Sequence, residues 1–390
     1  GRVWKTQRHK IDASDGSDDD NLQYLTWFDE EGRVINTDAD ELAKWTFDRL
    51  GRKTHKFVLA TDNDSAYSDV DDVTGDIVME EYQTTFDTSD GNVIMQATIQ
   101  RLHDDYGSGE TTGALDTNAD GDALEYTAGN LVGRAQITAY WYDAFDRRTE
   151  EARYGTYGGS DFDRDGLTAP PASSSTVILT KSSYATDGTL REVTDPRGKV
   201  TRYEFDDAGR RTKEIRNYDG SVNSGDPSGT DDNVTVEYEY TDGLRTEIAA
   251  RMPSSSDDQE TTYTFGTTKG IGTNDSKVAT GHLLYKIVYP GATSEDDGEL
   301  FAYNAQSQLI KKKMGDLGTP TVNVLEWDFD DRGREEHERA TTTASGFDTA
   351  VLRISTAYTD LGQVESVTQY DNATVGSGSI VDEVEYAYDG

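Results

Sequence analysis

The sequence predicts an all-β fold built from consecutive antiparallel hairpins, and three observations support this prediction. A short phrase recurs along the chain: an aromatic residue, Asp, two variable residues, Gly and usually Arg. The residues before each phrase alternate between two kinds of side chain, which is typical of a strand with one buried and one solvated face. The phrase itself has the composition of a tight turn. A unit that recurs at a regular interval indicates a repeat architecture.

The phrase is nearly complete at residues 28–33, 47–52, 205–210 and 329–334. Weaker copies begin at Phe86, Phe145, Tyr240, Tyr303, Tyr358 and Tyr388. The copy at Phe86 has its glycine one place late, at Gly91, and the copy at Phe145-Asp146 has lost the glycine. The copies are spaced at multiples of about 20 residues, so we expect about 25 to 30 strands once the longer connections are set aside.

The strand pattern is clearest at residues 234–241, where Val, Val, Tyr and Tyr alternate with Thr, Glu, Glu and Thr. The same alternation occurs at residues 201–205, 283–289, 325–329 and 384–388. In the turn that follows, Asp can bond its own backbone two residues on, and Gly can adopt the positive φ that closes a tight reversal. Each repeat is therefore predicted to be one hairpin, and stacked hairpins would bury a shared aromatic face.

With these motifs the chain resembles the YD-repeat, or RHS-repeat, family, which includes bacterial RHS proteins, cage components of insecticidal toxin complexes and teneurins. The resemblance extends over essentially the whole chain. It implies a continuous spiral of β-hairpins that forms the wall of a hollow shell, often around a C-terminal toxin or an unfolded cargo. It also implies that the aromatic residue and the Asp of each phrase have structural roles.

The composition is strongly acidic, with 75 Asp and Glu against 37 Lys and Arg and a formal net charge of -38. Only 34% of the residues are hydrophobic, which favours a thin sheet over a deep core. Nucleic-acid binding is not expected, because phosphate contacts need clustered Lys and Arg and the only basic run is 311–313. The chain has no cysteine, which excludes disulfides, and no apolar stretch long enough to span a membrane.

We expect residues 1–390 to be a single repeat segment that starts and stops within a repeat. Residues 1–3 resemble the second half of the phrase, and residues 388–390 resemble the first half. The segment is therefore predicted to be a piece of a larger protein whose targeting signal and C-terminal module lie elsewhere. An extracellular or cell-surface location is expected for that protein.

Longer connections between strands are rich in Ser, Gly, Asp and Thr and are expected to be exposed loops. They cover residues 12–21, 106–130, 155–175, 221–233, 253–260 and 291–298. Two of them alternate oxygen ligands with other residues and then place a glycine, as in the first half of an EF-hand calcium loop. The candidate ligands for Ca²⁺ are Asp116, Asn118, Asp120, Asp122, Asp161, Asp163 and Asp165.

Both candidate loops lack the Glu that closes the calcium motif at its twelfth position, where Thr127 and Ala172 stand instead. Glu125 could substitute in the first loop. The alternative explanation is that an acidic chain produces Asp-rich loops by chance.

The sequence carries no recognisable catalytic motif. The five histidines, His9, His55, His103, His282 and His337, are scattered, and neither a Gly-x-Ser-x-Gly elbow nor a phosphate-binding loop is present. The predicted function is a structural shell segment without catalysis, which would enclose a toxin or other cargo. A calcium-dependent adhesion or glycan-binding module, meeting a cell-surface protein or a glycan, remains an alternative. A carbohydrate-active enzyme is a more remote one, because 75 acidic residues offer many carboxylate pairs.

Overall fold

The protein is described from a computed structural model. The structure describes residues 5–11, 18–38, 42–62, 70, 72–102, 112–115, 133–157, 162, 164, 167–220, 231–271, 275–291, 297–317 and 322–388. The chain divides into two compact units, residues 1–200 and 201–390. Each unit is built from the same kind of hairpin.

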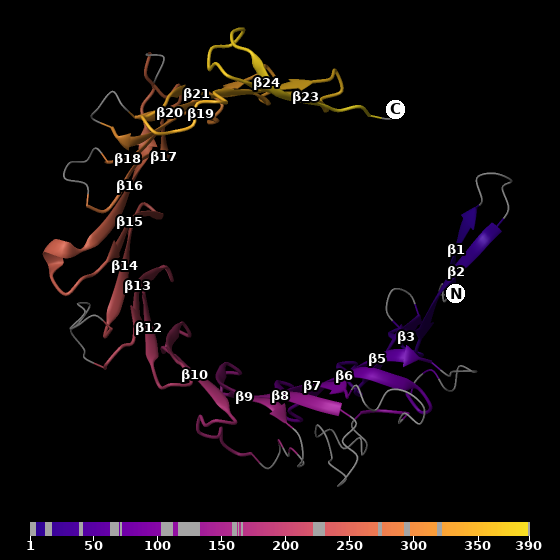
Figure 1. Ribbon diagram of the computed structural model, residues 1–390. Helices are drawn as coiled ribbons and strands as arrows, with labels where there is room; N and C mark the ends of the chain where they lie inside the picture. Colours follow the sequence, from indigo (N-terminus) through magenta and orange to yellow (C-terminus); the bar gives the residue numbers. More distant parts are fainter. Residues whose placement is uncertain are drawn as a thin grey trace. The chain divides into compact units, whose positions relative to one another are not determined.

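The first unit contains the strands that run from indigo to magenta in Figure 1. They are β1 (Lys5–Ile11), β2 (Asp18–Phe28), β3 (Val34–Asp38), β4 (Leu42–Phe47), β5 (Lys53–Thr61), β6 (Ile77–Phe86), β7 (Val93–Arg101), β8 (Gly133–Tyr142), β9 (Arg148–Tyr157), β10 (Ile178–Tyr184) and β11 (Leu190–Thr194).

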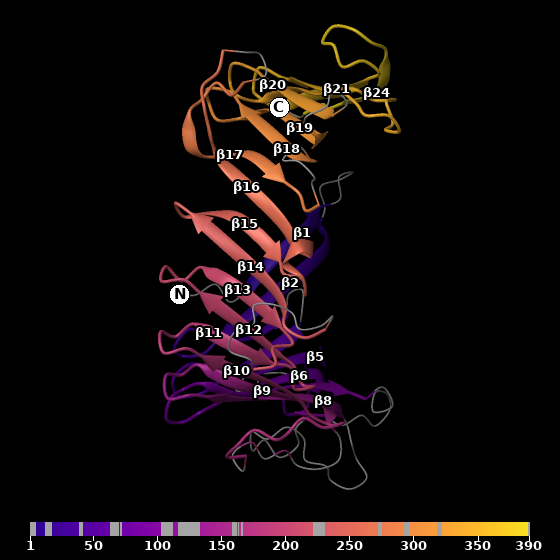
Figure 2. The same ribbon diagram turned by 90° about the vertical axis from the view of Figure 1, so that its left-hand side faces the viewer.

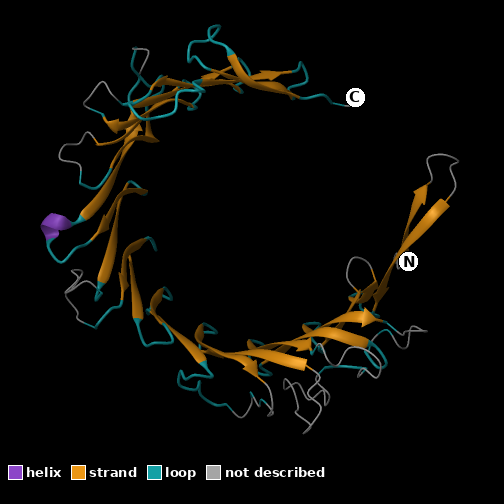
Figure 3. Ribbon diagram, in the orientation of Figure 1, coloured by secondary structure: helices purple, strands orange, loops and turns teal. Residues whose placement is uncertain are grey.

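The second unit continues with strands β12 to β24 and one short 3-10 helix, η2 (Ser255–Asp257), the purple element in Figure 3. The strands are β12 (Val200–Phe205), β13 (Arg211–Arg216), β14 (Val234–Thr241), β15 (Leu244–Ala250), β16 (Gln259–Thr267), β17 (Thr280–Val288), β18 (Asp297–Tyr303), β19 (Leu309–Asp316), β20 (Asn323–Phe329), β21 (Glu335–Thr342), β22 (Arg353–Tyr358), β23 (Val364–Tyr370) and β24 (Ile380–Glu385). Within the described parts of the chain, no helix has the length and apolar character needed to cross a membrane.

Each strand pairs antiparallel with the next strand in the sequence, from β1 to β11 in the first unit. The same holds from β12 to β24 in the second. Figure 2 shows strands β12 to β17 lying side by side in chain order. The predicted all-β fold of consecutive antiparallel hairpins is therefore confirmed.

Hairpins that carry the phrase share one distortion, which lies at the aromatic residue. The register shifts by one residue on entering Phe47 in the β4–β5 hairpin and Phe205 in the β12–β13 hairpin. The glycines of the two turns, Gly51 and Gly209, have φ of +79° and +75°. A type I turn closed by a left-handed glycine next to a bulge is a common hairpin connection, and the phrase encodes it.

The two edges of each sheet differ. Because the strands form a simple meander, the phrase turns other than the one at Asp195, between β11 and β12, join strands at one edge, and most of the longer connections join them at the other. The longer connections of the first unit fall between β5 and β6, β7 and β8, and β9 and β10. The second unit keeps this arrangement except for residues 268–279, a long connection at the edge of the phrase turns. We call the two edges the turn edge and the insertion edge.

In the first unit, one face of the sheet is apolar and covered. Strands β5 to β10 contribute most of the buried cluster, and residues from the longer connections complete it: Val73, Leu115, Phe162 and Val177. The strand residues of the cluster are Phe57, Leu59, Val78, Met95, Ala97, Ile99, Ala135, Ile137, Ala139, Trp141, Ala152 and Leu179. These four described residues of the connections therefore pack against the sheet of their own unit.

The prediction that these connections are exposed loops is wrong for several residues. Leu115 is 1% exposed, Phe162 is 4% exposed and Arg164 is 8% exposed. Phe162 packs edge-on against Tyr154 with 4.6 Å between the ring centroids. The guanidinium of Arg164 lies 4.4 Å from the Trp141 ring centroid and donates to three backbone carbonyls. Single apolar or long side chains within a polar connection are enough to anchor it.

The first unit also buries an ion pair. Lys44 Nζ lies 2.6 Å from Asp76 Oδ2, and the two side chains are 2% and 0% exposed. The same ammonium donates to the backbone carbonyl of Asp72 at 2.7 Å. A buried charge pair of this kind joins strand β4 to the connection that precedes β6.

The second unit has few buried apolar side chains. Those described are Ile215, Ala249, Ala302, Tyr303, Val322 and Val324. Its strands instead carry ion pairs between neighbours, such as Lys311 with Glu326 at 2.6 Å and Arg339 with Asp328 at 2.8 Å. This unit is held together by strand pairing and cross-strand charge pairs more than by a core.

Candidate functional site: the repeat turns and the Arg251 cluster

The carboxylate of the phrase organises the turn, as Asp206 shows. Its Oδ1 accepts hydrogen bonds from the backbone nitrogens of Ala208 (3.0 Å) and Arg210 (2.9 Å), and its Oδ2 accepts one from Arg210 Nε (2.7 Å). The Gly209 nitrogen donates to the Asp206 carbonyl at 2.9 Å. Hydrogen bonds from the Arg210 side chain and backbone hold the pKa of the Asp206 carboxyl below its ordinary value.

The same geometry recurs in the other complete copies. The distance from the arginine Nε to the carboxylate oxygen is 2.5 Å for Arg33 and Asp29, 2.6 Å for Arg52 and Asp48, and 2.7 Å for Arg334 and Asp330. In each pair the backbone nitrogen of the arginine also donates to the Asp side chain. Asp and Arg of the phrase therefore form one side-chain lock per turn.

The arginine of each lock also reaches the aromatic residue of the next phrase turn. The guanidinium carbon lies 4.1 to 4.7 Å from that ring's centroid in five pairs: Arg33 with Phe47, Arg52 with Phe86, Arg147 with Tyr184, Arg210 with Tyr240, and Arg334 with Tyr358. Cation–π contact at this distance is attractive. Arg52 additionally donates to the Gly91 carbonyl of the next turn at 3.2 Å.

Where the aromatic residue is Tyr, a second contact runs back to the preceding repeat. The hydroxyl donates to the carbonyl of the residue that follows the preceding turn: Tyr184 to Arg148 at 2.8 Å, Tyr240 to Arg211 at 3.0 Å, and Tyr358 to Glu335 at 2.9 Å. Phe at this position has no hydroxyl to donate. The cation–π contact, with the tyrosine hydrogen bond where the ring is Tyr, links these turns to one another, and we call these contacts the stitch.

The weak copy predicted at Phe145-Asp146 is wrong by three residues. The turn is 142–147, in which Asp143 takes the place of the phrase Asp and accepts from Arg147 Nε at 2.8 Å. Asp146 occupies the glycine position with φ of +58°. Asp tolerates the left-handed conformation better than most residues, so the turn persists without glycine.

One other predicted copy differs from the structure, one turn was not predicted, and the copy at Phe86 agrees. In the copy at Tyr240, residues 242–243 form a two-residue turn, because Thr241 pairs directly with Leu244. Asp195 builds a phrase turn that the sequence pattern missed, because its preceding residue is Thr194 and not an aromatic one. The late glycine at Gly91 is confirmed, since its nitrogen donates to the Asp87 carbonyl at 3.1 Å.

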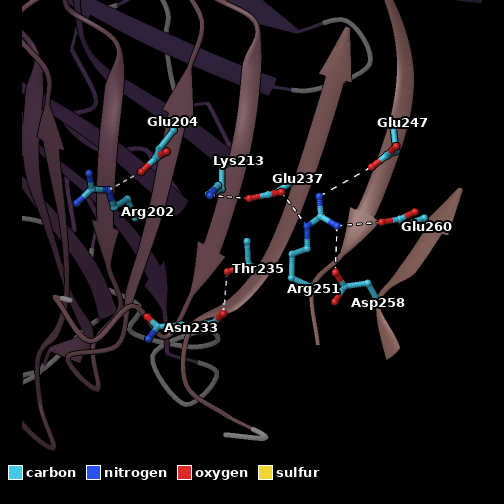
Figure 4. Close-up of polar contacts among 10 residues, drawn as sticks. All are labelled: Arg202, Glu204, Lys213, Asn233, Thr235, Glu237, Glu247, Arg251, Asp258 and Glu260. Atoms are coloured by element: carbon cyan, nitrogen blue, oxygen red, sulfur yellow. Dashed lines mark hydrogen bonds and ion pairs between the residues drawn. The ribbon is translucent and has the colours of Figure 1, made fainter. Parts of the chain in front are cut away.

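A separate polar cluster surrounds Arg251 in the second unit (Figure 4). Its guanidinium contacts carboxylates from the following connection and from strands β14 to β16. The distances are 2.8 Å to Glu237, 3.0 Å to Asp258, 3.0 Å to Glu260 and 3.9 Å to Glu247. The cluster therefore ties the η2 connection to three neighbouring strands.

The carboxylates around Arg251 are in unequal environments. Burial, with the charges of Glu239 and Glu260 next, raises the pKa of Glu247, and Arg251 opposes this only in part. Glu239 lies directly across the strand pair from Glu247, an arrangement of like charges that destabilises a sheet. Although burial acts to raise the pKa of Glu237, hydrogen bonds from Lys213 and Arg251 lower it. Glu247 is thus the surplus negative charge of the cluster.

The seven predicted calcium ligands, Asp116, Asn118, Asp120, Asp122, Asp161, Asp163 and Asp165, all lie outside the described residues. Among the residues that the structure does describe, no group of three or more His, Asp or Glu side chains is arranged to hold a metal ion. Calcium binding by the two loops stays a prediction.

The comparison with protein families bears on the repeat itself. Residues 184–222 match the RHS repeat model, and this segment contains the phrase turn of Asp206 together with the turn of Asp195. This segment carries the RHS repeat. The resemblance to the RHS-repeat, or YD-repeat, family is thereby confirmed.

Solved structures similar to this RHS-repeat chain include the crystal structures of TcdB2-TccC3-Cdc42 and of TcdB2-TccC3-TEV. The first has 14% sequence identity and a TM-score of 0.30, covering 92% of this chain and 21% of that chain. The second has 14% identity and a TM-score of 0.31, covering 99% and 21%. A Tc holotoxin pore from Photorhabdus luminescens has 13% identity and a TM-score of 0.29, covering 98% and 22%. This chain spans about a fifth of the length of these solved chains. No curated protein sequence matches.

Within the described residues, the RHS phrase has a structural role. Its aromatic residue, Asp, Gly and Arg are used in closing the turn and in contacting the neighbouring turn. The sequence pattern identified these positions as structural, although it could not show that Arg reaches the following repeat. No sequence motif indicated the Arg251 cluster, because its carboxylates lie on different strands of a chain that is acidic throughout.

Proposed function

We propose that this chain is a segment of the wall of a hollow RHS shell, which isolates an enclosed cargo from solvent outside the cell or at its surface. The stitch carries the proposal. In five pairs of neighbouring phrase turns the arginine of one turn contacts the ring of the next, so the sheet can extend by one hairpin after another without a separate core.

The wall would work passively. Strand pairing satisfies the backbone hydrogen-bonding groups between neighbouring hairpins, and the locks and stitches fix one edge of the sheet. The connections of the insertion edge cover one sheet face in the first unit. Such a sheet separates two compartments without using a reactive group.

The enclosed cargo would be a toxin or another module of the same parent protein. Protease protection of the whole native protein tests this. We expect a segment outside residues 1–390 to resist proteinase K while the wall is intact, and peptide mapping by mass spectrometry would identify it.

Weakening the wall should expose the same segment. The variant carries Arg210→Ala and Arg334→Ala, which remove two locks together with their stitches. Asp207→Asn is the matched control, because Asp207 is an exposed residue at the tip of one of these turns. The proposal is overturned if the native protein protects no segment, or if the double variant and the control protect it equally. Binding of the intact protein to cells or polysaccharide without any protected segment would favour the adhesion alternative.

A further inference from the structure

One face of strands β20 to β23 carries a row of polar side chains that includes a histidine and a serine. Cross-strand register places Asp328 opposite His337, His337 opposite Ser355, and Ser355 opposite Thr368. His337 Nδ1 lies 3.0 Å from Ser355 Oγ. A hydroxyl and an imidazole at this distance have the geometry of a nucleophile and its base.

Ser355 is also held by a cation. The Nε of Arg353 donates to Ser355 Oγ at 3.2 Å, and Arg353 itself is 3% exposed. The other end of this guanidinium donates to the carbonyls of Asn372, Thr374 and Ser377, and the group stacks 3.9 Å from the Tyr370 ring centroid. These contacts fix the orientation of Arg353. Ser355 Oγ therefore accepts from a permanently charged donor and can pass its own proton to His337 Nδ1.

The pair is open to a small molecule. His337 and Ser355 both line a pocket of about 460 Å³ on the sheet face. The pocket is also lined by Tyr358, Thr368 and Glu383, so its walls are largely polar. The site therefore combines an accessible pocket, a base within hydrogen-bond reach of Ser355, and a cation that fixes the orientation of the serine.

We propose that Ser355 and His337 form a reactive nucleophile–base pair that accepts the acyl group of a small polar ester. Ser355 Oγ attacks the ester carbonyl carbon while its proton moves to His337 Nδ1, and the carbonyl electron pair moves onto the oxygen. When the carbonyl re-forms, the bond to the alcohol breaks and His337 returns the proton to the leaving oxygen. Water then hydrolyses the acyl-serine by the same route, with His337 as base.

Arg353 is a positioning residue in this scheme. Its Nε stabilises negative charge on Ser355 Oγ during the attack, and its remaining bonds keep the loop after β23 in place. His337 must carry its own proton on Nε2 for Nδ1 to act as the base. This activity would add a reaction to the structural role and does not depend on an enclosed cargo.

A fluorophosphonate probe, which reacts with activated serines, tests the proposal on the intact protein. Peptide mapping of the labelled wild-type chain should place the probe on Ser355 and not on Ser366, which lines the same pocket. A second internal comparison is Thr46, whose Oγ1 lies 3.0 Å from His55 Nδ1 but which also shares a hydrogen bond with Thr54. Labelling should be absent from Thr46 as well.

The variant His337→Gln should lower the labelling rate of Ser355 by about a hundredfold or more, because the base is lost. Ser256→Ala, at an exposed serine of the same unit outside this pocket, should leave the rate unchanged. Burst release of p-nitrophenol from p-nitrophenyl acetate, in an amount stoichiometric with the protein, should follow the same order. The proposal is overturned if wild-type protein labels Ser355 no faster than urea-unfolded chain does, or if it labels Ser366 equally. Both outcomes are measured on the wild-type chain, so they do not depend on whether the variants fold.

Discussion

The two units of this RHS-repeat chain use the same hairpin but are stabilised differently. In the first unit, connections from the insertion edge bury an apolar cluster against strands β5 to β10. In the second, neighbouring strands are joined by charge pairs, and the described buried apolar residues are few and scattered. The repeat therefore defines strand pairing and turns, whereas the connections decide whether a core is present.

The largest effect is expected from breaking the buried ion pair of the first unit. Replacing Lys44 by Met leaves the Asp76 carboxylate buried without its 2.6 Å partner. We expect a loss of about 3 to 5 kcal/mol in the free energy of unfolding of this unit. Urea denaturation with hydrogen exchange to assign each transition would measure it. The double variant Lys44→Met/Asp76→Leu is the control, and it should recover much of the loss because no unpaired charge remains.

A cavity in the apolar cluster should cost somewhat less. Ile137 is 1% exposed at the centre of the cluster, and Ile137→Ala should lower the stability of the first unit by about 3 to 4 kcal/mol. Ile215 in the second unit is 2% exposed, but it lies outside the buried apolar cluster. We therefore expect Ile215→Ala to cost about 2 kcal/mol in the same assay. Equal losses would contradict the idea that only the first unit has a core.

Both units contain turn glycines with positive φ, and replacing one of them tests how much this conformation matters for stability. Gly209 has φ of +75°, and Gly209→Ala should cost about 1 to 2 kcal/mol because a side chain is strained in this conformation. Gly281 is the matched control in the same unit, since it lacks a positive φ and an added Cβ would meet nothing within 4 Å. The two thermal midpoints should therefore differ. If Gly281→Ala were as damaging, left-handed geometry would not be the reason.

The smallest expected effect concerns pH and the Arg251 cluster. The pKa of Glu247 is raised above its ordinary value of 4.5, so the folded state takes up this proton before the unfolded state does. Stability of the second unit should therefore rise slightly as pH falls through that raised value. The pKa of Asp206 is lowered below 3.8, so the stability that its lock provides should be lost in stronger acid.

Substitutions within the Arg251 cluster test the contribution of Glu247 to stability. Glu247→Gln should raise the thermal midpoint of the second unit slightly at pH 7 and have no effect once Glu247 is protonated. Glu237→Gln is the control on the same cluster, and it should lower the midpoint, because Glu237 pairs with both Lys213 and Arg251. A lower midpoint for Glu247→Gln would show that its 3.9 Å contact with Arg251 outweighs its repulsion from Glu239.

The sequence was sufficient for the hairpin and its turn, because those depend on local chemistry. Asp, Gly and an aromatic residue at fixed spacing predicted the turn at Asp206 and its relatives. The pattern failed where another residue took over a conformational role, as Asp146 did for glycine. It also missed the Asp195 turn, because the turn keeps its hydrogen bonds without the aromatic residue.

Contacts between distant residues could not be predicted in this way. Lys44 and Asp76 lie in separate elements, and nothing near either residue indicates a buried partner. Leu115 and Phe162 are isolated apolar residues in polar connections, so they lack the periodicity that identifies a buried face. Ser355 and His337 meet only because the β21–β22 register aligns them.

The separation of the two edges has a consequence for how such a chain can change its length. A longer connection at the insertion edge leaves the turn edge and its stitches untouched, and each doubling of a flexible loop costs only about 0.6 kcal/mol. New segments can therefore be acquired at that edge without disturbing strand register. A repeat protein of this design can diversify its surface by lengthening connections at the insertion edge, while the turn edge preserves the strand pairing.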